Sequence, residues 1–418
     1  MFSIITPAHP SSSKWIRETY ESLLSQTFTD WQWILLLNSG LSSLPIKILN
    51  DERVRVYEDE SGTTSIGQLK KTCASYATHE IIVELDADDL LTPDALECLS
   101  VEYTNPDVGF VYSNSASFNS EDGSPVTPFS SFHGWKTREF QWNGQNLNEM
   151  IAWGPSPHMM RDIFWAPDHV RSWRRSVYEE IGGHDASLSV GDDHDLCMRS
   201  YIHLGSSGIR HIDKCLYLYR IHGNNTHITD NQSVRDQSTN NYIRHGRSMM
   251  VKWAQENELR TLDLGGRFEP WVDFETVDLL DADIVTDLNR VWPFEDNSVG
   301  VIRASHIFEH LIDPIHAMNE AFRVLAPGGW LLLEVPSTDG RGAFQDPSHV
   351  SFWNQNSIRY YTDSRWSRYI RPMYKGRFQD SRTITFFPFN DESVPVVQSD
   401  MIAVKGGYAD RFVGGVYD

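Results

Sequence analysis

The sequence has little of three things that mark particular protein classes: cysteine, basic residues and long apolar runs. The four cysteines are far apart and form no CxxC pair, which favours reduced thiols over a disulfide framework or a zinc site. No apolar run reaches the roughly 18 residues that a transmembrane helix needs, so we expect no membrane span. The opening MFSIITPAHP has no basic leader before an apolar core. We therefore expect no secretory signal and a cytoplasmic protein.

The charge balance is strongly acidic, with 36 Lys and Arg residues against 57 Asp and Glu residues and a net charge of −21. A duplex-binding surface needs clustered Lys and Arg, and no basic stripe stands out. Nucleic acid is therefore an unfavoured partner. An anionic small molecule stays compatible with this charge, because a metal ion can reverse the local potential.

The length of 418 residues exceeds one ordinary core, so we expect two domains. In both halves, strand-like runs alternate with helix-like segments, which predicts layered α/β folds with mostly parallel sheets. A polar and then helical stretch separates the halves. We expect domains at 1–235 and 259–408, a helical linker at 236–258 and a C-terminal tail at 409–418.

One short stretch has an unusual distribution of charge. The apolar run IIVEL ends in Asp86, Asp88 and Asp89, and carboxylates that leave a buried strand need a partner. Mg or Mn takes oxygen ligands and bridges carboxylates to phosphates, and α/β sheets bind ligands at the carboxyl ends of their strands. The alternative is that Asp88 or Asp89 caps the helix expected in LTPDALECLSVEY. This motif alone does not decide.

Three further motifs accompany this stretch. SIITPAHP precedes LDADDLLTPDALE, and SWRRSVYEEIGGHDASLSVGDDHDLCMRS and then LYLYRIHGNNT follow it. Together they resemble family 2 glycosyltransferases, which have the GT-A fold, over roughly residues 1–229. The resemblance implies a nucleotide-diphosphate sugar bound at the strand ends. It also implies an inverting transfer to the hydroxyl of a glycan or glycoprotein acceptor.

The same resemblance suggests roles for individual residues. Asp86 would contact the ribose, Asp88 would hold the metal, and Asp193 would be the base that takes the proton of the acceptor hydroxyl. Asp192 is the acidic residue before the base, on the acceptor side. The alternative is that this acidic pair only begins a helix. His222 is either a metal or phosphate ligand or a solvent-facing loop histidine.

Further candidates on the donor side are Pro7, His9, Asn38, Lys70 and Ala87. Asn38 stands where the family usually has Asp, and His9 where an aromatic or another polar residue is more usual, so the nucleotide preference is open. Lys70 either faces the donor or lies on a solvated helix face.

Tryptophan is concentrated in and just after the irregular segment between residues 118 and 167, at Trp135, Trp142, Trp153, Trp165 and Trp173. Flat indoles suit stacking on a sugar, although core filling is the more frequent role of a single Trp. We expect an acceptor-side wall that includes Arg171 and Trp173.

The second half contains RTLDLGG, then TDL, EHL and LAPGG in that order. Over residues 259–336 it resembles class I methyltransferases that depend on S-adenosylmethionine, with a Rossmann-like fold. FPFNDESVPVVQSDMIAVKG is expected to supply the terminal antiparallel strands. The resemblance implies that Asp278 binds the cofactor ribose and that Asp287 and Leu288 face adenine. The full set of implied cofactor residues is Asp263, Gly265, Gly266, Asp278, Asp287, Leu288 and His306.

This half departs from the family in its glycine motif. No third glycine follows Gly266, and Asp263 and Asp278 are too close in sequence for the usual helix between them. The domain then has either a trimmed cofactor pocket or only a structural role. His349 is either the base for methyl transfer or a loop histidine bonded to Asp346.

We therefore expect a glycosyltransferase whose second domain O-methylates the glycan. One alternative is a glycosyltransferase with a degenerate, structural second domain. Another is a non-catalytic carbohydrate-binding or assembly protein.

Overall fold

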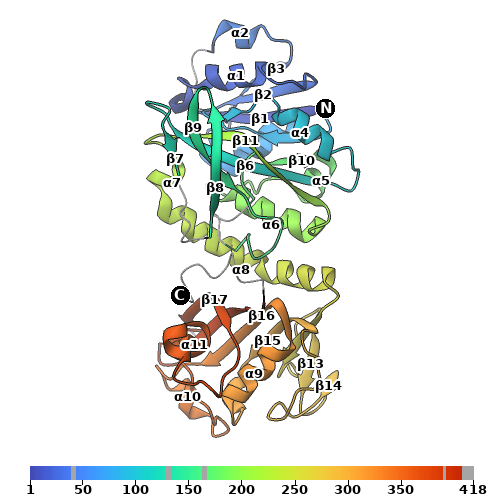
Figure 1. The fold of residues 1–418 in the computed structure, drawn as a ribbon, viewed down its shortest axis with the longest axis vertical. Helices are drawn as coiled ribbons and strands as arrows, with labels where there is room; N and C mark the ends of the chain where they lie inside the picture. Colours follow the sequence, from blue (N-terminus) through green and yellow to red (C-terminus); the bar gives the residue numbers. More distant parts are fainter. Residues whose placement is uncertain (39–43, 128–133, 162–166, 389–391, 407–418) are drawn as a thin grey trace. The chain divides into compact units, whose positions relative to one another are not determined.

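The computed structural model describes residues 1–38, 44–127, 134–161, 167–388 and 392–406. The chain divides into two compact units within helix α8 (Asn231–Glu256), after Met249. Both units combine helices with one β-sheet (Figure 1), which confirms the prediction of two α/β domains. The sheet of the C-terminal unit is largely parallel, as expected, whereas that of the N-terminal unit is mixed, because β5, β7, β8, β9 and β10 pair antiparallel. Among the described residues, no helix combines the length and the hydropathy that crossing a bilayer requires.

The N-terminal unit is built on a sheet in the order β3-β2-β1-β4-β10-β6-β11-β5. The first four of these strands are parallel, and β10 is inserted antiparallel between β4 and β6. The strands are β1 (Phe2–Ala8), β2 (Trp31–Leu37), β3 (Val54–Glu58), β4 (Ile81–Glu84), β5 (Leu90–Leu91), β6 (Phe110–Asn119), β7 (Pro125–Val126), β8 (Lys136–Trp142), β9 (Gln145–Ile151), β10 (Ser172–Arg174) and β11 (Ile209–Ile221).

The core of this unit follows from continuous apolar runs. All seven residues of β2 are buried, because this strand lies inside the sheet between β1 and β3. Helix α3 packs on β1 and β2, and α6 packs on α3. The helices are η1 (Pro10–Ser12), α1 (Ile16–Leu24), α2 (Ile46–Leu49), α3 (Ile66–Ser75), α4 (Ala95–Glu102), α5 (Arg175–Glu180), α6 (Asp192–Leu204) and α7 (Thr226–Thr229).

Part of the segment expected to be irregular forms a long hairpin, β8 and β9 (Figure 1). Its turn is Asn143-Gly144, with φ angles of 47° and 79°. An Asn-Gly pair at positive φ is the usual two-residue connection between antiparallel strands. Within the motif that begins SWRRSVYEE, the first three residues form β10 and the next six form α5.

The C-terminal unit has one seven-stranded sheet in the order β14-β13-β12-β15-β16-β18-β17. Its strands are β12 (Arg260–Leu264), β13 (Glu275–Asp278), β14 (Ile284–Val285), β15 (Val299–Ser305), β16 (Leu325–Pro336), β17 (Phe378–Phe386) and β18 (Val396–Ala403). The last two strands to pair, β18 and β17, are antiparallel. Of the two, only β18 lies in the segment predicted to supply both, since β17 precedes that segment.

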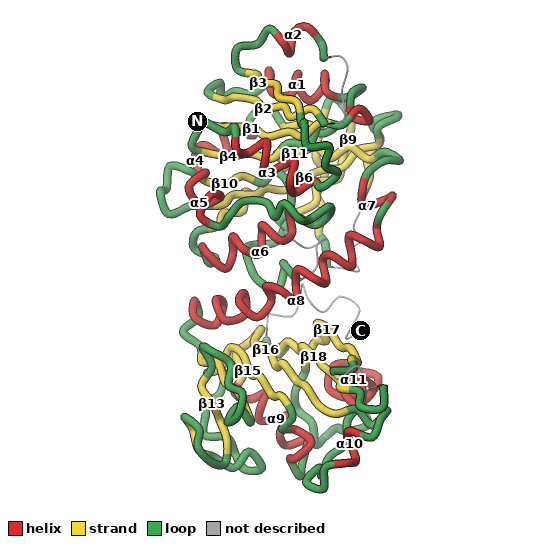
Figure 2. The backbone as a smooth tube through the Cα atoms, turned by 180° about the vertical axis from the view of Figure 1, so that it is seen from behind, coloured by secondary structure: helices red, strands yellow, loops and turns green. Residues whose placement is uncertain are grey.

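Helices in this unit are few. They are η4 (Phe308–His310), α9 (Pro314–Val324), α10 (Gly342–Gln345), α11 (Gln355–Thr362) and α12 (Ser364–Ser367). Residues 265–274, between β12 and β13, are all described and form no helix, so this Rossmann-like sheet is trimmed there. The helix predicted for 236–258 corresponds to α8, which starts earlier, ends at Glu256 and is unbroken (Figure 2). The predicted tail at 409–418 lies outside the described residues.

Candidate active site

The acidic stretch after β4 is a turn at the edge of the sheet. Asp86 and Asp88 are half-buried, whereas Ala87 and Asp89 are buried. The carboxylate of Asp89 accepts hydrogen bonds from the Tyr217 hydroxyl at 2.8 Å and the Arg220 N–H at 2.7 Å, so it is structural. Helix α4 begins later, at Ala95. The alternative that Asp88 or Asp89 caps this helix is therefore wrong.

Asp86 is the acid in this turn that lacks a partner. Its carboxylate accepts no hydrogen bond from the described part of the chain. Burial raises the pKa of Asp86 to about 6, although Lys70 acts in the opposite direction. A buried carboxylate with free lone pairs is suited to accept hydrogen bonds from hydroxyl groups of a ligand.

Asp88 pairs with His222, which comes from the loop after β11. His222 Nε2 lies 2.8 Å from Asp88 Oδ2, and the histidine ring packs against Trp15 at a tilt, with 4.2 Å between ring centroids. Two ligands of one Mg or Mn ion at right angles lie about 3 Å apart, so an ion fits this pair when it replaces the shared proton. Asp88 is 19% exposed, which leaves it accessible to a diphosphate.

A chain of buried charges begins at Glu84, the last residue of β4. Its carboxylate lies 3.3 Å from Lys70 Nζ, 2.9 Å from Arg171 Nε and 2.6 Å from His184 Nε2. Burial alone would raise the pKa of Glu84, but Lys70 and Arg171 outweigh it and hold this pKa well below its usual range. Lys70 is itself buried, so the alternative of a solvated helix face is wrong for this residue.

The chain of charges continues to Asp193, in the first turn of α6. Arg171 Nη1 lies 2.8 Å from Asp193 Oδ2, and Asp193 Oδ1 accepts the His194 N–H at 2.8 Å. Burial would raise the pKa of Asp193, but Arg171 and Lys70 lower it below its usual range. The side chain is ionised and 23% exposed, as a base that meets a substrate must be.

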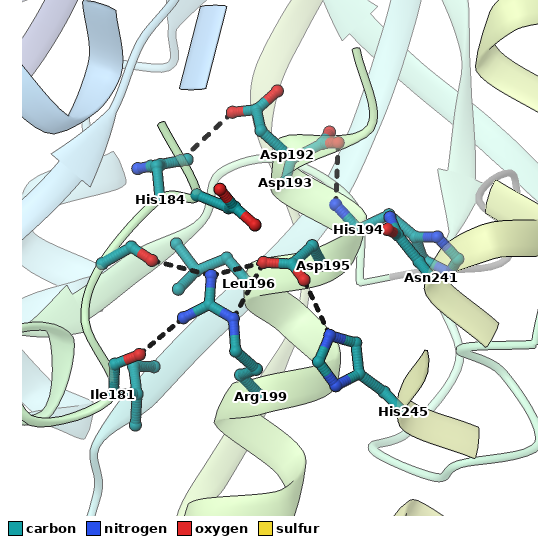
Figure 3. Close-up of polar contacts among 12 residues, drawn as sticks. Ile181, His184, Asp192, Asp193, His194, Asp195, Leu196, Arg199, Asn241 and His245 are labelled. Atoms are coloured by element: carbon teal, nitrogen blue, oxygen red, sulfur yellow. Dashed lines mark hydrogen bonds and ion pairs between the residues drawn. The ribbon is translucent and has the colours of Figure 1, made fainter. Parts of the chain in front are cut away.

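Asp192 directly precedes Asp193 in the same turn (Figure 3) and is buried. Its Oδ2 is buried and accepts no hydrogen bond from the described residues, with His184 Nε2 at 3.6 Å and Lys70 Nζ at 3.7 Å. Both acids do begin a helix, as the alternative reading proposed. Their place in a buried network of opposite charges shows that a helix start is not their whole role.

Helix α8 fixes the position of this turn (Figure 3). Gly191, which precedes Asp192, has a φ of 68°, and its carbonyl accepts the Asn241 side-chain N–H at 2.8 Å. One turn further along α6, Asp195 lies 2.7 Å from His245 Nε2 and accepts Arg199 Nε at 2.8 Å. Asn241 and His245 belong to α8, so this helix holds the acidic turn in place within its own unit.

The other donor-side candidates lie where β1 and β2 end. Pro7 is half-buried within β1, and Asn38 is buried after β2 with its N–H bonded to the Ala8 carbonyl at 2.8 Å. His9 is exposed and caps η1 by accepting the Ser11 N–H at 3.3 Å. The structure thus joins Lys70, Arg171 and the acidic pair in one network, and gives His9 a local capping contact.

The acceptor wall of tryptophans is corrected by burial. Trp173 is fully buried, its indole N–H donates to Ser200 Oγ at 2.9 Å, and it stacks on Phe110. Trp135 and Trp153 are also buried, against each other. The rings of Trp135, Trp153 and Trp173 therefore have no face for a sugar. Trp142 is half-buried and stacks on Phe140, and Trp165 lies outside the described residues. Arg171 faces Asp193 and Glu84, and not an open wall.

In the C-terminal unit, the acid at the end of β12 is already neutralised. Asp263 is fully buried beside Arg303, its neighbour in register on β15, with Arg303 Nη1 2.8 Å from Asp263 Oδ2. Asp263 also accepts the Trp271 N–H at 2.9 Å. Gly265 has a φ of 75°, and a Cβ on Gly266 would lie 2.6 Å from Asp263 Cγ. Both glycines are therefore required by the turn itself.

The remaining cofactor candidates are placed as follows. Asp278 Oδ1 accepts the Leu279 N–H at 2.6 Å, and Asp287 Oδ1 accepts the Asn289 N–H at 2.9 Å. Leu288 is buried in the core, which corrects the expectation that it faces adenine. His306 lies 3.3 Å from both Glu309 and Glu334; hydrogen bonds to these two raise its pKa to about 9.

His349 does not bond Asp346 in the way expected of a loop histidine. Its Nδ1 is 2.9 Å from the Ala343 carbonyl, whereas its Nε2 lies 3.9 Å from Asp346 Oδ2.

Comparison with known proteins separates the two units. Residues 3–166 match the family described as Glycosyl transferase family 2, and residues 250–333 match a family described as Methyltransferase domain. The chain joins a family 2 glycosyltransferase domain to a methyltransferase domain. Both resemblances seen in the sequence are thereby confirmed.

Relatives of the glycosyltransferase domain include proteins named for O-antigen biosynthesis and chondroitin synthesis. The O-antigen biosynthesis protein RfbC of Myxococcus xanthus is 26% identical over 52% of this chain and 16% of its own length. The chondroitin synthase of Pasteurella multocida is 25% identical over 58% of this chain and 24% of its own length. The chondroitin synthase of Escherichia coli is 27% identical over 54% of this chain and 30% of its own length. Each match spans less than a third of the relative.

Among solved structures, S. aureus TarS 1-349 in complex with UDP-GlcNAc is 15% identical, with a TM-score of 0.44. The likeness covers 62% of this chain and 71% of that chain.

Sequence reasoning missed Glu84 and His184 in the glycosyltransferase domain. The signal for Glu84 was available, because a glutamate inside the apolar run IIVEL needs a buried partner. No pattern pointed to His184, since its contact with Glu84 joins residues that are far apart in the chain.

Proposed function

We propose that the glycosyltransferase domain transfers a sugar, with inversion, from a nucleotide-diphosphate sugar to a hydroxyl of a glycan or glycoprotein. The observation that carries this proposal is the buried chain of charges from Glu84 through Arg171 to Asp193. It ties a base at the start of α6 to the strand whose next residues are Asp86 and Asp88. Donor-side and acceptor-side groups are thus held in one network.

In this proposal Asp193 is the base. As the acceptor oxygen attacks the anomeric carbon, the bond from that carbon to the diphosphate oxygen breaks and Asp193 takes the hydroxyl proton. Arg171 holds the carboxylate ionised and in place through its 2.8 Å contact. Asp192, buried beside Lys70 and His184, helps to position the turn that carries Asp193 and is not itself in reach of the substrate.

Asp86 and the pair of Asp88 and His222 serve the donor. Asp86 accepts hydrogen bonds from the ribose hydroxyls. Asp88 and His222 would hold Mg or Mn, which neutralises charge on the departing diphosphate. Pro7, Asn38, Lys70 and Ala87 surround the same strand ends. A polysaccharide acceptor agrees with the names of the relatives.

The test is turnover of nucleotide sugars by the full chain. A panel of UDP-, GDP- and dTDP-sugars is incubated with Mn²⁺ or with EDTA, and nucleotide diphosphate release is measured. We expect slow, metal-dependent hydrolysis of at least one donor even without an acceptor. No turnover, together with no donor binding by calorimetry, contradicts the proposal and favours the alternative of a binding or assembly protein.

For the methyltransferase domain, a finer proposal is O-methylation of the glycan with S-adenosylmethionine. The family match and the position of Asp278 at the end of β13 support it. The fit to the cofactor is incomplete, because Asp263 is neutralised by Arg303 and no helix follows Gly266.

Titration with S-adenosylhomocysteine decides between this function and a structural role. Binding of one equivalent by calorimetry, lost in Asp278→Asn and kept in Asp281→Asn, supports the enzyme. Asp281 is the matched control because it is an exposed acid in the same loop region. Absence of any binding heat supports the structural role.

A further inference from the structure

Three side chains of the methyltransferase domain come together outside the glycine turn. Glu309 and His310 lie in η4, directly after β15, and His349 lies in the loop between α10 and α11. One ligand-type atom from each of the three lies within 4.8 Å of the other two. The carboxyl end of a parallel strand such as β15 is where α/β sheets bind ligands.

The hydrogen bonds of the two histidines select one tautomer. His349 Nδ1 lies 2.9 Å from the Ala343 carbonyl, so it carries the proton and donates it there. His310 Nδ1 lies 3.3 Å from the Ser348 carbonyl and 3.2 Å from Ser348 Oγ. Because the Ser348 hydroxyl donates its proton to Asp346 Oδ1 at 2.6 Å, both oxygens accept, and His310 Nδ1 is assigned in the same way. In both rings Nε2 then has a free lone pair. Histidines that bind metals are oriented in this manner, with the second nitrogen donating to a carbonyl.

Glu309 supplies the second, independent observation. The residue is only 2% exposed, and its Oε2 is buried without a hydrogen-bond partner among the described residues. A buried carboxylate oxygen without a partner is costly, and a bound cation removes that cost. The backbone holds the group in place, since the Glu309 carbonyl accepts the N–H groups of Val350 and Ser351 at 2.8 and 3.0 Å.

We propose that Glu309, His310 and His349 bind one divalent first-row transition ion of the Mn²⁺, Co²⁺ or Zn²⁺ type. Two imidazoles and one carboxylate are a usual donor set for such ions. Three protein ligands leave positions open, which suits the binding of a substrate hydroxyl or carboxylate oxygen. His349 is then a metal ligand and not a free base.

The proposal is independent of both proposed activities. It shares no residue with the Asp88 and His222 pair, and it does not require S-adenosylmethionine. Its test must still separate the two metal sites. The background for the test is therefore the full chain with Asp88→Asn and His222→Gln, stripped with EDTA and dialysed.

The probe is Co²⁺, followed by equilibrium dialysis and by visible absorption. In this background we expect one Co²⁺ per chain and a d–d band. His310→Gln and His349→Gln, added one at a time, should each weaken binding at least about 10-fold. The matched control is His316→Gln, because His316 lies in the same unit and bonds the Arg290 carbonyl, and it should leave binding unchanged.

Thermal unfolding keeps the test decisive if a variant is less stable. Co²⁺ should raise the unfolding temperature of the background and of the His316→Gln control, but not that of Glu309→Gln, which keeps the buried shape. The proposal is overturned if the background binds no Co²⁺. It is also overturned if His310→Gln and Glu309→Gln bind Co²⁺ as tightly as the control.

Discussion

Both domains place acids at the carboxyl ends of parallel strands, but they treat those acids differently. After β4, the carboxylate of Asp86 accepts no hydrogen bond from the described residues, and Asp193 faces Arg171 while remaining 23% exposed. After β12, Asp263 is fully buried beside Arg303 and covered by the loop through Trp271. The topology brings acids to an edge in each case. The neighbouring strand decides whether they remain available.

This difference shows why the family match alone says less about the function of the methyltransferase domain than about that of the glycosyltransferase domain. In the glycosyltransferase domain, opposite charges hold Glu84 and Asp193 ionised, and the Asp86 carboxylate stays without a hydrogen bond from the described residues. In the methyltransferase domain, the free carboxylate oxygen belongs to Glu309, at the neighbouring strand β15. In this domain, therefore, a carboxylate oxygen without a hydrogen bond from the described part of the chain lies in η4, and the acid beside the glycine turn is already paired.

The largest expected effect concerns Asp193, the proposed base of the glycosyltransferase domain. Asp193→Asn removes the proton acceptor but keeps the shape, so we expect sugar transfer to fall by about 10²–10⁴-fold. Donor affinity should change little, because Asp193 serves the acceptor side. Initial rates and calorimetric donor binding measure the two effects separately.

The control for this variant is Asp185→Asn, which replaces a half-buried acid that accepts hydrogen bonds from Ser187 in the preceding loop. It should leave the rate near that of the unmodified chain. Transfer by Asp193→Asn within about tenfold of that rate, which is about 1.4 kcal/mol, would exclude Asp193 as the base.

The next effect concerns the second edge. Arg303→Met leaves the buried Asp263 carboxylate without its partner, so the methyltransferase domain should lose about 3 kcal/mol of stability. The double variant with Asp263→Asn should recover most of this loss. Denaturant unfolding followed by tryptophan fluorescence measures both.

Arg267→Met is the matched control for the Arg303 variant, because Arg267 pairs with the exposed Asp281. Exposed pairs contribute about 0–1 kcal/mol, so its effect should be small. Equal losses of stability in Arg303→Met and Arg267→Met would contradict the inference that the buried Asp263 depends on Arg303 for its partner.

Sequence reasoning found the acids of both edges because each follows an apolar strand. It could not find their partners, since Arg171 reaches Glu84 across 87 positions and Arg303 reaches Asp263 across 40. Trp173 was misplaced for a related reason. A strand residue points to one of two faces, and only the pairing of β10 with β4 and β6 put this ring inside.

Other features were accessible to sequence reasoning. The missing helix after Gly266 was predicted from the short spacing between Asp263 and Asp278. The hairpin of β8 and β9 was not predicted, although Asn143-Gly144 is a strong signal for such a turn. Local rules would have placed it where the surrounding composition suggested a loop.

A smaller effect concerns Asp88 and His222, the proposed metal ligands of the glycosyltransferase domain. Asp88→Asn and His222→Gln each remove one ligand, so we expect the Mn²⁺ concentration for half-maximal activity to rise by about 10–100-fold. His203→Gln is the control, because this histidine lies near Glu180 at the far end of α6. Activity that needs no divalent ion, or variants with unchanged Mn²⁺ dependence, would remove the metal from the proposal.

The smallest effect separates stability from function at Asp86. Its raised pKa of about 6 means that the folded chain favours the protonated form. This stabilisation is complete below the unfolded pKa of about 3.9 and is lost as the pH rises through about 6. At pH 7, Asp86→Asn should therefore stabilise the domain by about 1–3 kcal/mol, and the gain should vanish near pH 4. Donor affinity should fall in the variant and lose its dependence on pH near 6.

Asp51→Asn should behave in the opposite way. The hydrogen bond from Arg53 lowers the pKa of Asp51 to about 2, so its charge stabilises the fold at pH 7 and the substitution should destabilise it. Thermal unfolding at pH 4 and pH 7 compares the two variants. If Asp86→Asn also lowers the stability at pH 7, the Asp86 carboxylate already has partners within the fold. Asp86 would then be no more available to a ligand than Asp263.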